Sequence, residues 1–110
     1  LYALLSPAKK LDFGPSPLQV KATAPALMAD AAPLAARAKK YSAADLKRLM
    51  EISDKLAKLN FERFQAFDLK NEAETKPALF AFNGDVYLGL DAKSLSAAEV
   101  KYAQDHLGIL

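Results

Sequence analysis

The chain has 110 residues, of which 52% are apolar, and it carries a formal net charge of +2 and no cysteine. This length accommodates one modest domain. The absence of cysteine excludes disulfides, thiolate metal sites and cysteine nucleophiles. No apolar run reaches the roughly 18 residues of a membrane-spanning helix, so no membrane partner is expected. The first residues lack the basic stretch of a secretory signal, which makes the cytoplasm the default location.

The charge is distributed unevenly along the chain. Residues 1–50 carry eight Lys or Arg and three Asp or Glu, whereas residues 51–110 carry seven and ten. The basic first half could face an anionic partner such as nucleic acid. A solvated surface accounts for the same charges, so charge alone leaves both interpretations open.

The first forty residues predict a strand, a loop and a helix in that order. Residues 2–5 form a short apolar run that predicts a buried strand, and the proline-rich residues 6–17 predict a loop. Residues 25–40 predict a helix. Pro25 suits its first turn, whereas Pro33 is expected to kink the helix or split it in two, because proline removes a backbone donor.

The middle of the chain predicts helix with one open question. Ser42 followed by Asp45 is a capping-box pattern, and apolar residues then keep helical spacing to about residue 67. Ser53 could cap a second helix that begins at Asp54. One bent helix and two separate helices therefore both fit the pattern, and the polar residues 68–76 predict a loop.

The last third predicts a second strand and two more helices. Residues 78–82 are apolar on both faces, which is typical of a strand covered on both sides. Residues 85–90 predict a short helix, and Ser96 with Glu99 forms a capping box before a last helix over 97–110. The fold class is mixed α/β, helix-rich, with at least two strands. Two strands alone make a marginal sheet, so we expect an incomplete fold whose exposed strand flanks and last helix favour self-association.

Two segments that follow predicted strands carry candidate chemistry. Lys9 and Lys10 lie just after the first strand and could hold a phosphate, although solvated loop lysines would look the same. Asp85 follows the second strand. It could act as a general base or metal ligand, or it could cap the helix that begins there. Tyr87 is expected to be half-buried with its hydroxyl satisfied.

The remaining candidates have simple structural interpretations. The run Ser53-Asp54-Lys55 could provide an ionic pair at a helix start, or it could provide a helix cap and a surface charge. His106 lies on a semi-apolar helix face and is expected to be structural. No metal-ligand spacing and no hydrolase triad is evident, so no metal and no cofactor is predicted.

Four segments, taken in order, resemble the YaaA family of bacterial peroxide-stress proteins: SPAKKLDF (6–13), ISDKLAKLNFERFQAF (52–67), PALFAFNGDVYLGL (77–90) and AQDHLGIL (103–110). Each segment is weakly specific, but their ordered combination is highly specific. Similarity is weakest over 18–45. The chain begins without Met and ends on an apolar, helix-like stretch, which fits a portion of a longer protein. The resemblance corresponds to the first two-fifths of a family member.

The resemblance implies a cytoplasmic bacterial protein, of which this chain would be the incomplete N-terminal portion of a single larger domain. It also implies a role in survival under hydrogen peroxide, a lowering of intracellular free iron, and DNA binding through a basic cleft and a helix-hairpin-helix element. Residues 97–110 would supply the first helix of that element, truncated before its glycine-rich hairpin. No protein partner is implied.

Matches to the family motifs extend to individual residues. The first motif is matched by Ser6, Pro7, Lys9, Leu11 and Asp12, the second by Ser53, Asp54, Lys55 and Leu56, and the third by Phe82, Gly84, Asp85, Val86 and Tyr87. Lys10 stands where members often have Thr, so Lys9 is the better candidate for a functional cation.

Three functional hypotheses follow. In the first, Lys9, Lys10 and Lys55 contact the phosphates of double-stranded or structured DNA without reading base sequence. In the second, the SPAKK and GDVY motifs form an enzyme pocket in which Lys9, Lys55, Asp85 and Tyr87 are an acid–base set, with Ser6 and Asp54 as further pocket candidates. In the third, carboxylates such as Asp12, Asp54 and Asp85 bind iron directly, although scattered acids make a poor ferrous site. The DNA hypothesis is preferred, and the sequence leaves catalytic activity undecided.

Overall fold

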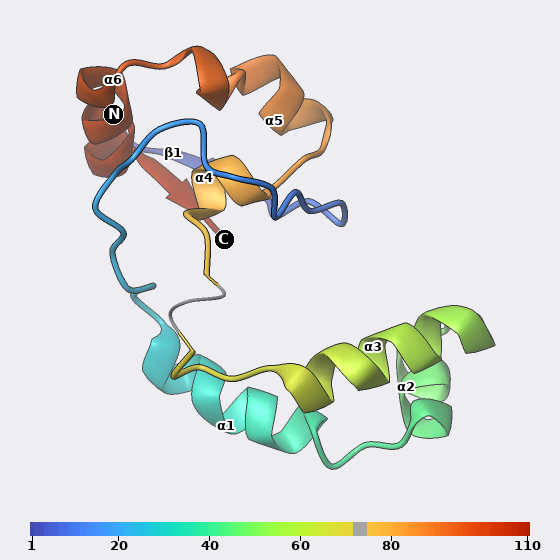
Figure 1. The fold of residues 1–110 in the computed structure, drawn as a ribbon. Helices are drawn as coiled ribbons and strands as arrows, with labels where there is room; N and C mark the ends of the chain where they lie inside the picture. Colours follow the sequence, from blue (N-terminus) through green and yellow to red (C-terminus); the bar gives the residue numbers. More distant parts are fainter. Residues whose placement is uncertain (72–74) are drawn as a thin grey trace. The chain divides into compact units, whose positions relative to one another are not determined.

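A computed structural model describes residues 1–71 and 75–110 (Figure 1). The chain divides into two compact units. Unit 1 comprises Leu1–Thr23 and Thr75–Leu110, and unit 2 comprises Ala24–Glu74. Among the described residues, the apolar core of unit 1 consists of Phe80, Ala81, Tyr87 and Ala92, and that of unit 2 consists of Leu46 and Ala57. Among the described residues no helix is long and apolar enough to cross a membrane.

The sheet of unit 1 joins the two ends of the chain. Strand β1 (Ala3–Leu5) pairs in parallel with strand β2 (Leu107–Ile109), with Ala3 opposite Leu107. Helix α6 (Ala97–His106) leads directly into β2, which lies beside β1 (Figure 1). The helix predicted over 97–110 therefore ends at His106, because the backbone becomes extended at Leu107 to pair with β1. The described elements confirm a mixed α/β, helix-rich fold.

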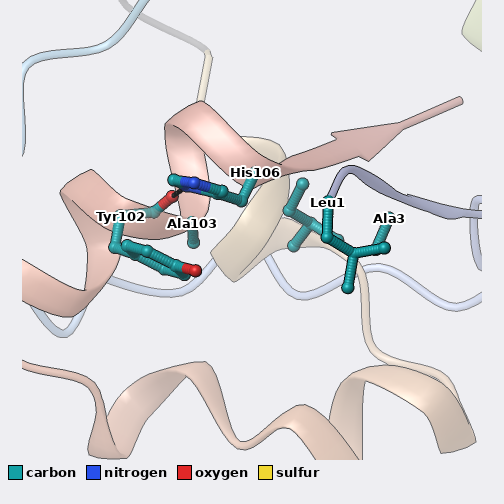
Figure 2. A pocket seen from close by; sticks show the side chains of 6 residues that line it. Leu1, Ala3, Tyr102, Ala103 and His106 are labelled. Carbon is teal, nitrogen blue, oxygen red and sulfur yellow. Dashed lines mark hydrogen bonds between the residues drawn. The ribbon is translucent and has the colours of Figure 1, made fainter.

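The prediction of a buried first strand is wrong in one respect. The strand forms, but Leu4 remains 62% exposed, because the pair of strands has little apolar cover. Beside β1 lies an apolar hollow of about 270 Å³, which Figure 2 shows between the strand and α6. The His106 ring stacks on Tyr102 with centroids 3.8 Å apart, and its Nδ1 lies 2.8 Å from the Tyr102 carbonyl oxygen. Both contacts hold the His106 ring within its own helix, as expected for a structural histidine.

The second predicted strand is wrong. Residues Ala78–Ala81 form one helical turn, α4, which Pro77 precedes as the N-terminal cap. Only Phe82 takes part in a β-bridge, an antiparallel one with Leu11. A short apolar run fits a buried helical turn as well as a strand, and here the turn buries Phe80 and Ala81.

The rest of unit 1 follows the sequence signals. Helix α5 (Asp85–Leu90) and the 3-10 helix η2 (Ala92–Ser94) precede α6. The capping box of α6 is formed: the Ser96 hydroxyl accepts the Glu99 N–H, and the Glu99 carboxylate accepts the Ser96 N–H at 2.7 Å. Hydrogen bonds from the Ser96 backbone N–H, and then from its hydroxyl, lower the pKa of Glu99.

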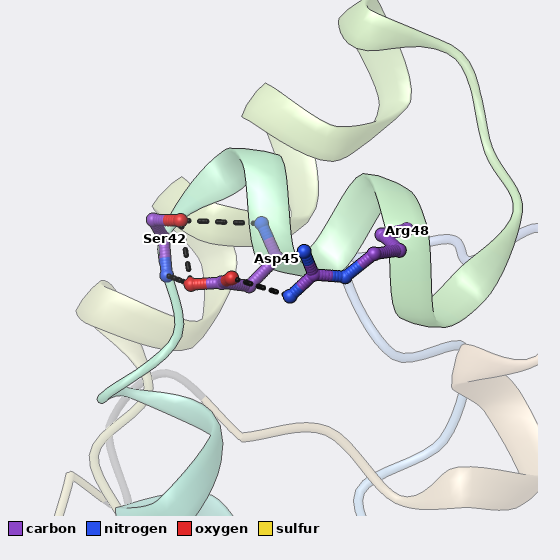
Figure 3. A network of polar contacts seen from close by, with 3 residues as sticks. All are labelled: Ser42, Asp45 and Arg48. Carbon is purple, nitrogen blue, oxygen red and sulfur yellow. Dashed lines mark hydrogen bonds and ion pairs between the residues drawn. The ribbon is translucent and has the colours of Figure 1, made fainter.

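The described part of unit 2 holds three helices: α1 (Met28–Ala38), α2 (Ala43–Met50) and α3 (Asp54–Ala66). Helix α1 continues through Pro33, so the alternative in which this proline splits the helix in two is wrong. At the start of α2, Ser42 and Asp45 form the predicted capping box, and Arg48 joins it through a 3.1 Å contact with Asp45 (Figure 3). The Ser42 hydroxyl, and then its backbone N–H, lower the pKa of Asp45.

Two separate helices, rather than one bent helix, occupy residues 43–66. Glu51 ends α2 in the left-handed conformation with φ of 52°, and Ser53 then caps α3 by accepting the Leu56 N–H at 3.3 Å. The Lys47 ammonium group lies 2.8 Å from the Asp54 carboxylate and joins the two helices at this corner. A left-handed residue followed by a new cap breaks the helical hydrogen-bond ladder.

Candidate functional site

The two motifs of unit 1 meet in the fold. We call residues 6–12 the basic loop and residues 76–87 the anchor segment. Backbone hydrogen bonds join them: the Asn83 N–H donates to the Lys10 carbonyl at 3.0 Å, and the Asp12 N–H donates to the Ala81 carbonyl at 2.7 Å. The bridge between Leu11 and Phe82 lies between these two bonds. The anchor segment therefore fixes the backbone of the basic loop.

Gly84 allows the anchor segment to approach Ala8 of the basic loop closely. A Cβ atom at this position would lie 3.0 Å from the Cβ of Ala8, which is tighter than ordinary van der Waals contact. The φ of Gly84 is −122°, a value open to any residue, so the requirement is for space and not for an unusual backbone. This glycine of the GDVY motif thus fits against the SPAKK motif.

Lys9 and Lys10 are exposed on the basic loop. Within residues 1–71 and 75–110, neither ammonium group forms an ion pair within 4 Å. Two adjacent positive charges that form no ion pair within the described residues are therefore presented to solvent on a fixed backbone. Such a pair attracts anionic groups, above all phosphate, because the carboxylate of Asp12 acts on Lys10 only from beyond ion-pair distance.

Asp12 is the last residue of the basic loop and makes several polar contacts. Its Oδ1 accepts the Gly14 N–H at 2.8 Å and lies 3.8 Å from the Lys76 ammonium group, while Oδ2 lies 4.0 Å from that of Lys93. The Gly14 hydrogen bond is the largest cause that lowers the pKa of Asp12, followed by the charge of Lys76. The Lys76 ammonium group also donates to the Asp12 carbonyl oxygen at 2.8 Å.

Tyr87 is a structural link between the two motifs. Its side chain is buried, and its hydroxyl donates to the Ser6 carbonyl at 2.6 Å. Burial raises the pKa of Tyr87, and its ring lies 5.3 Å from that of Phe82. The prediction of a satisfied hydroxyl is confirmed, but the side chain is more deeply buried than predicted. A hydroxyl held by a carbonyl and shielded from solvent is poorly placed for acid–base chemistry.

Of the alternatives for Asp85, the helix cap is wrong. Gly84 occupies the N-cap position of α5, and Asp85 is the first helical residue, with no side-chain hydrogen bond to the helix end. Asp85 is exposed, where its negative charge complements the positive end of the helix dipole. The cap requires extended backbone geometry, and Gly84 rather than Asp85 adopts it here.

A hollow of about 290 Å³ opens beside Asp12, Asn83, Tyr87 and Lys93. Of the residues proposed from the sequence for an enzyme pocket, only Tyr87 lines it. Ser6, Lys9 and Asp85 lie elsewhere in unit 1. The structure thus brings Ser6 and Tyr87 together through a hydrogen bond, without assembling the full predicted set around one cavity.

Asp54 and Lys55 belong to unit 2 and form a separate candidate site. Asp54 is 88% exposed and pairs with Lys47, not with Lys55. Lys55 is exposed on the first turn of α3 and has no ion pair in the described part of the chain. The first alternative for this pair of residues, an Asp54–Lys55 ion pair, is therefore wrong, because Lys47 reaches the carboxylate from α2.

Sequence reasoning missed the role of Lys76 and Lys93. Both contact Asp12 from more than sixty positions further along the chain, and no local pattern predicts such a contact. The sequence Asp12-Phe13-Gly14 does suggest a turn in which the aspartate accepts a later N–H, and this turn is formed. Over residues 1–71 and 75–110, no group of three or more His, Asp or Glu side chains is placed to hold a metal ion.

These features define a helix-rich mixed α/β protein whose basic loop is held by a distant anchor segment. Along residues 1–110 the sequence matches the family described as peroxide stress protein YaaA, and the chain belongs to this family. The family resemblance inferred from four motifs is confirmed.

Relatives in three bacteria are called UPF0246 proteins. The one from Phenylobacterium zucineum is 54% identical over 107 residues, which cover 97% of this chain and 40% of the relative. The one from Jannaschia is 51% identical over all 110 residues and 42% of the relative. The one from Saccharophagus degradans is 46% identical over 108 residues, which cover 97% of this chain and 42% of the relative. The chain thus spans about two-fifths of the length of these curated relatives.

Proposed function

We propose that this chain serves a peroxide stress response by binding the phosphate backbone of DNA through its basic loop. The observation that carries the proposal is the pair of exposed, unpaired ammonium groups of Lys9 and Lys10 on a backbone fixed by the anchor segment. The ligand is double-stranded or structured DNA, bound without base readout, because lysines on phosphates position a protein without carrying sequence information.

The fixed backbone of the basic loop favours binding. A mobile loop would lose conformational freedom when it bound DNA, whereas this loop is already ordered by bonds to Ala81 and Asn83. Paired cations of the chain, such as Lys47 and Arg48, would have to give up their carboxylates first. Lys9 and Lys10 have no such partner to lose in the described structure.

Two further parts of the chain belong to the proposal. Lys55, exposed on α3, is a second phosphate contact from unit 2. Helix α6 is the first helix of the helix-hairpin-helix element that the family resemblance implies, now with its C-terminal end at His106. The role of α6 rests on the family resemblance, and the role of Lys55 rests on the resemblance and on the exposure of its side chain.

The experiment is a DNA-binding titration of the full chain by fluorescence anisotropy, with duplex and bubble DNA, over a series of salt concentrations. Binding through phosphates weakens steeply with salt. The slope of log K against log salt is negative. Loss of one phosphate contact in Lys9→Met should make this slope less steep by about 0.9. Lys21→Met is the matched control, because Lys21 is also an exposed lysine in the first segment of unit 1.

Three outcomes decide the proposal. A reduced slope in Lys9→Met and an unchanged slope in Lys21→Met support it. Equal effects of both variants would show that only net charge matters and would contradict a specific role for the loop. No binding by the unmodified chain would overturn the proposal and favour the enzyme alternative.

The proposal includes the lowering of intracellular free iron that the family resemblance implies. If DNA binding and iron limitation depend on the same loop, peroxide-treated cells that carry Lys9→Met and Lys10→Met should contain more free iron than cells with the unmodified protein. Electron paramagnetic resonance of chelated ferric iron measures this pool. Unchanged iron together with lost DNA binding would separate the two roles.

A further inference from the structure

The basic loop is attached to the anchor segment at both of its ends. At one end the Ser6 carbonyl accepts the Tyr87 hydroxyl, and at the other end the Asp12 carbonyl accepts the Lys76 ammonium group. Lys9 and Lys10 lie between these two attachments. The first attachment is a neutral hydrogen bond, whereas the second is charge-assisted and involves two oxygens of one residue, since the Asp12 carboxylate also lies 3.8 Å from Lys76.

Lys76 is the unusual member of this arrangement. Its side chain is only 7% exposed, whereas lysine is almost always at the surface. An ammonium group removed from water is costly unless it is paired and hydrogen-bonded. In the described part of the chain its partners are the carbonyl and the carboxylate of Asp12. The charge of Lys76 is therefore compensated when the end of the basic loop is in place.

We propose that Lys76 is a positioning residue that acts through Asp12 to hold the basic loop, so that Lys9 and Lys10 are presented to phosphate in a fixed geometry. This inference rests on the proposed function. Lys76 is too buried to contact DNA itself, so its influence on binding is exerted through the loop alone.

Lys93 provides a matched control. Its ammonium group lies 4.0 Å from the same carboxylate, but its side chain is 71% exposed and it makes no hydrogen bond to the Asp12 backbone. Lys76→Met and Lys93→Met remove the same charge from the vicinity of the same aspartate. Only the first variant removes the attachment of the loop.

The first test needs no DNA. Amide hydrogen exchange, followed by NMR in the full chain, reports on the Asp12 and Asn83 N–H groups, whose acceptors are the Ala81 and Lys10 carbonyls. In Lys76→Met both should exchange about tenfold faster or more, because local opening of the loop becomes easier. Lys93→Met should leave both rates unchanged, and Lys76→Arg should restore part of the protection. Unchanged exchange in Lys76→Met would overturn the inference.

The second test measures DNA binding of the same variants. Lys76→Met should weaken binding by about tenfold, because the loop must be ordered on binding, while the salt slope stays that of the unmodified chain. Lys9→Met should reduce the slope instead. If exchange accelerates in Lys76→Met while Lys9→Met leaves DNA binding intact, the proposed function fails and the positioning of the loop stands.

Asp12→Asn keeps the inference testable if Lys76→Met does not fold. This variant retains the carbonyl that accepts the Lys76 bond and the oxygen that accepts the Gly14 N–H, but it removes the countercharge. Exchange at the Asn83 amide should accelerate by a smaller factor than in Lys76→Met, and loss of DNA affinity should follow in proportion. Exchange and affinity equal to those of the unmodified chain would overturn the inference.

Discussion

At Asp12, one carboxylate faces a backbone donor and two ammonium groups, and its pKa is lowered chiefly by the Gly14 N–H and next by Lys76. A lowered pKa means that the folded chain holds the ionised form more tightly than the unfolded chain does. The stabilisation is therefore fully present above the ordinary carboxyl pKa of 3.8 and is lost as the pH falls through the lower, folded value.

This sign gives a testable pH dependence. The difference in unfolding free energy between the unmodified chain and Asp12→Asn should be constant from pH 7 to about pH 5 and should shrink on further acidification. Urea unfolding at a series of pH values, followed by circular dichroism, measures it. A difference that stays constant down to the most acid pH would show that ionisation of Asp12 contributes nothing to the fold.

Tyr87 shows how a residue can match a motif and still serve the fold. The sequence predicts a half-buried side chain with a satisfied hydroxyl here, and the motif makes it a candidate for acid–base chemistry. Its bond to Ser6 spans 81 positions of the chain, and its ring is buried against Phe82. The satisfied hydroxyl could be predicted, because buried tyrosines rarely leave the group unpaired. Its partner could not, because Ser6 is remote in sequence.

At the scale of elements, two glycines around α5 have opposite expected effects. In Gly84→Ala the new Cβ would meet Ala8 at 3.0 Å, so the variant should lower the free energy of unfolding by about 1 kcal/mol. In Gly89→Ala, inside α5, the new Cβ meets no atom within 4 Å, so stability should rise by roughly 0.5–1 kcal/mol. Thermal and urea unfolding measure both changes.

The pair of variants contains its own control, since each adds the same methyl group. A loss of stability in both would mean that α5 tolerates no added side chain, and the special role of Gly84 would be contradicted. Equal gains in both would show that Ala8 moves aside freely. Opposite signs support the close packing of the basic loop on the anchor segment.

Elements with local signals could be predicted from the sequence, and elements fixed by distant contacts could not. Ser42, Ser53 and Ser96 all cap helices as expected, because a serine hydroxyl satisfies an N–H only two or three residues away. Strand β2 exists because its residues reach β1, more than a hundred positions earlier. The residues of β2 continue the helical apolar spacing of α6, and no local sequence signal near Leu107 predicts the change from helix to strand.

At the scale of the whole molecule, much apolar surface remains exposed. Large side chains that are more than half exposed occur in both units, including Leu4 and Leu88 in unit 1 and Leu34 and Leu49 in unit 2. Unpartnered apolar surface of this kind favours association. Sedimentation of the 110-residue chain should give a weight-average mass that rises above 11.9 kDa with concentration.

Single substitutions show which exposed apolar surface causes the self-association. Leu4→Lys tests the strand face of unit 1, and Leu34→Lys tests α1 in unit 2, and neither side chain is buried. A mass that stays at 11.9 kDa over the whole concentration range would contradict the prediction.

The candidate site could be predicted only in part, again because of distance in the sequence. The lysines of the basic loop and the residues of the GDVY motif were identifiable, since each follows a predicted strand or matches a family motif. That one motif packs on the other depends on bonds between Lys10 and Asn83 and between Asp12 and Ala81. The buried partner, Lys76, has no local signature that distinguishes it from a surface lysine.

The parallel pairing of β1 with β2 has a consequence during protein synthesis. Ala3 is synthesised more than a hundred residues before its partner Leu107. At bacterial elongation rates of about 5–20 residues per second, the first strand waits roughly 5–20 seconds for its neighbour. Unit 2 is a continuous segment that can form its helices meanwhile. The nascent chain therefore carries β1 without its partner strand throughout this interval, and its apolar side chains are open to other contacts until Leu107 has been added.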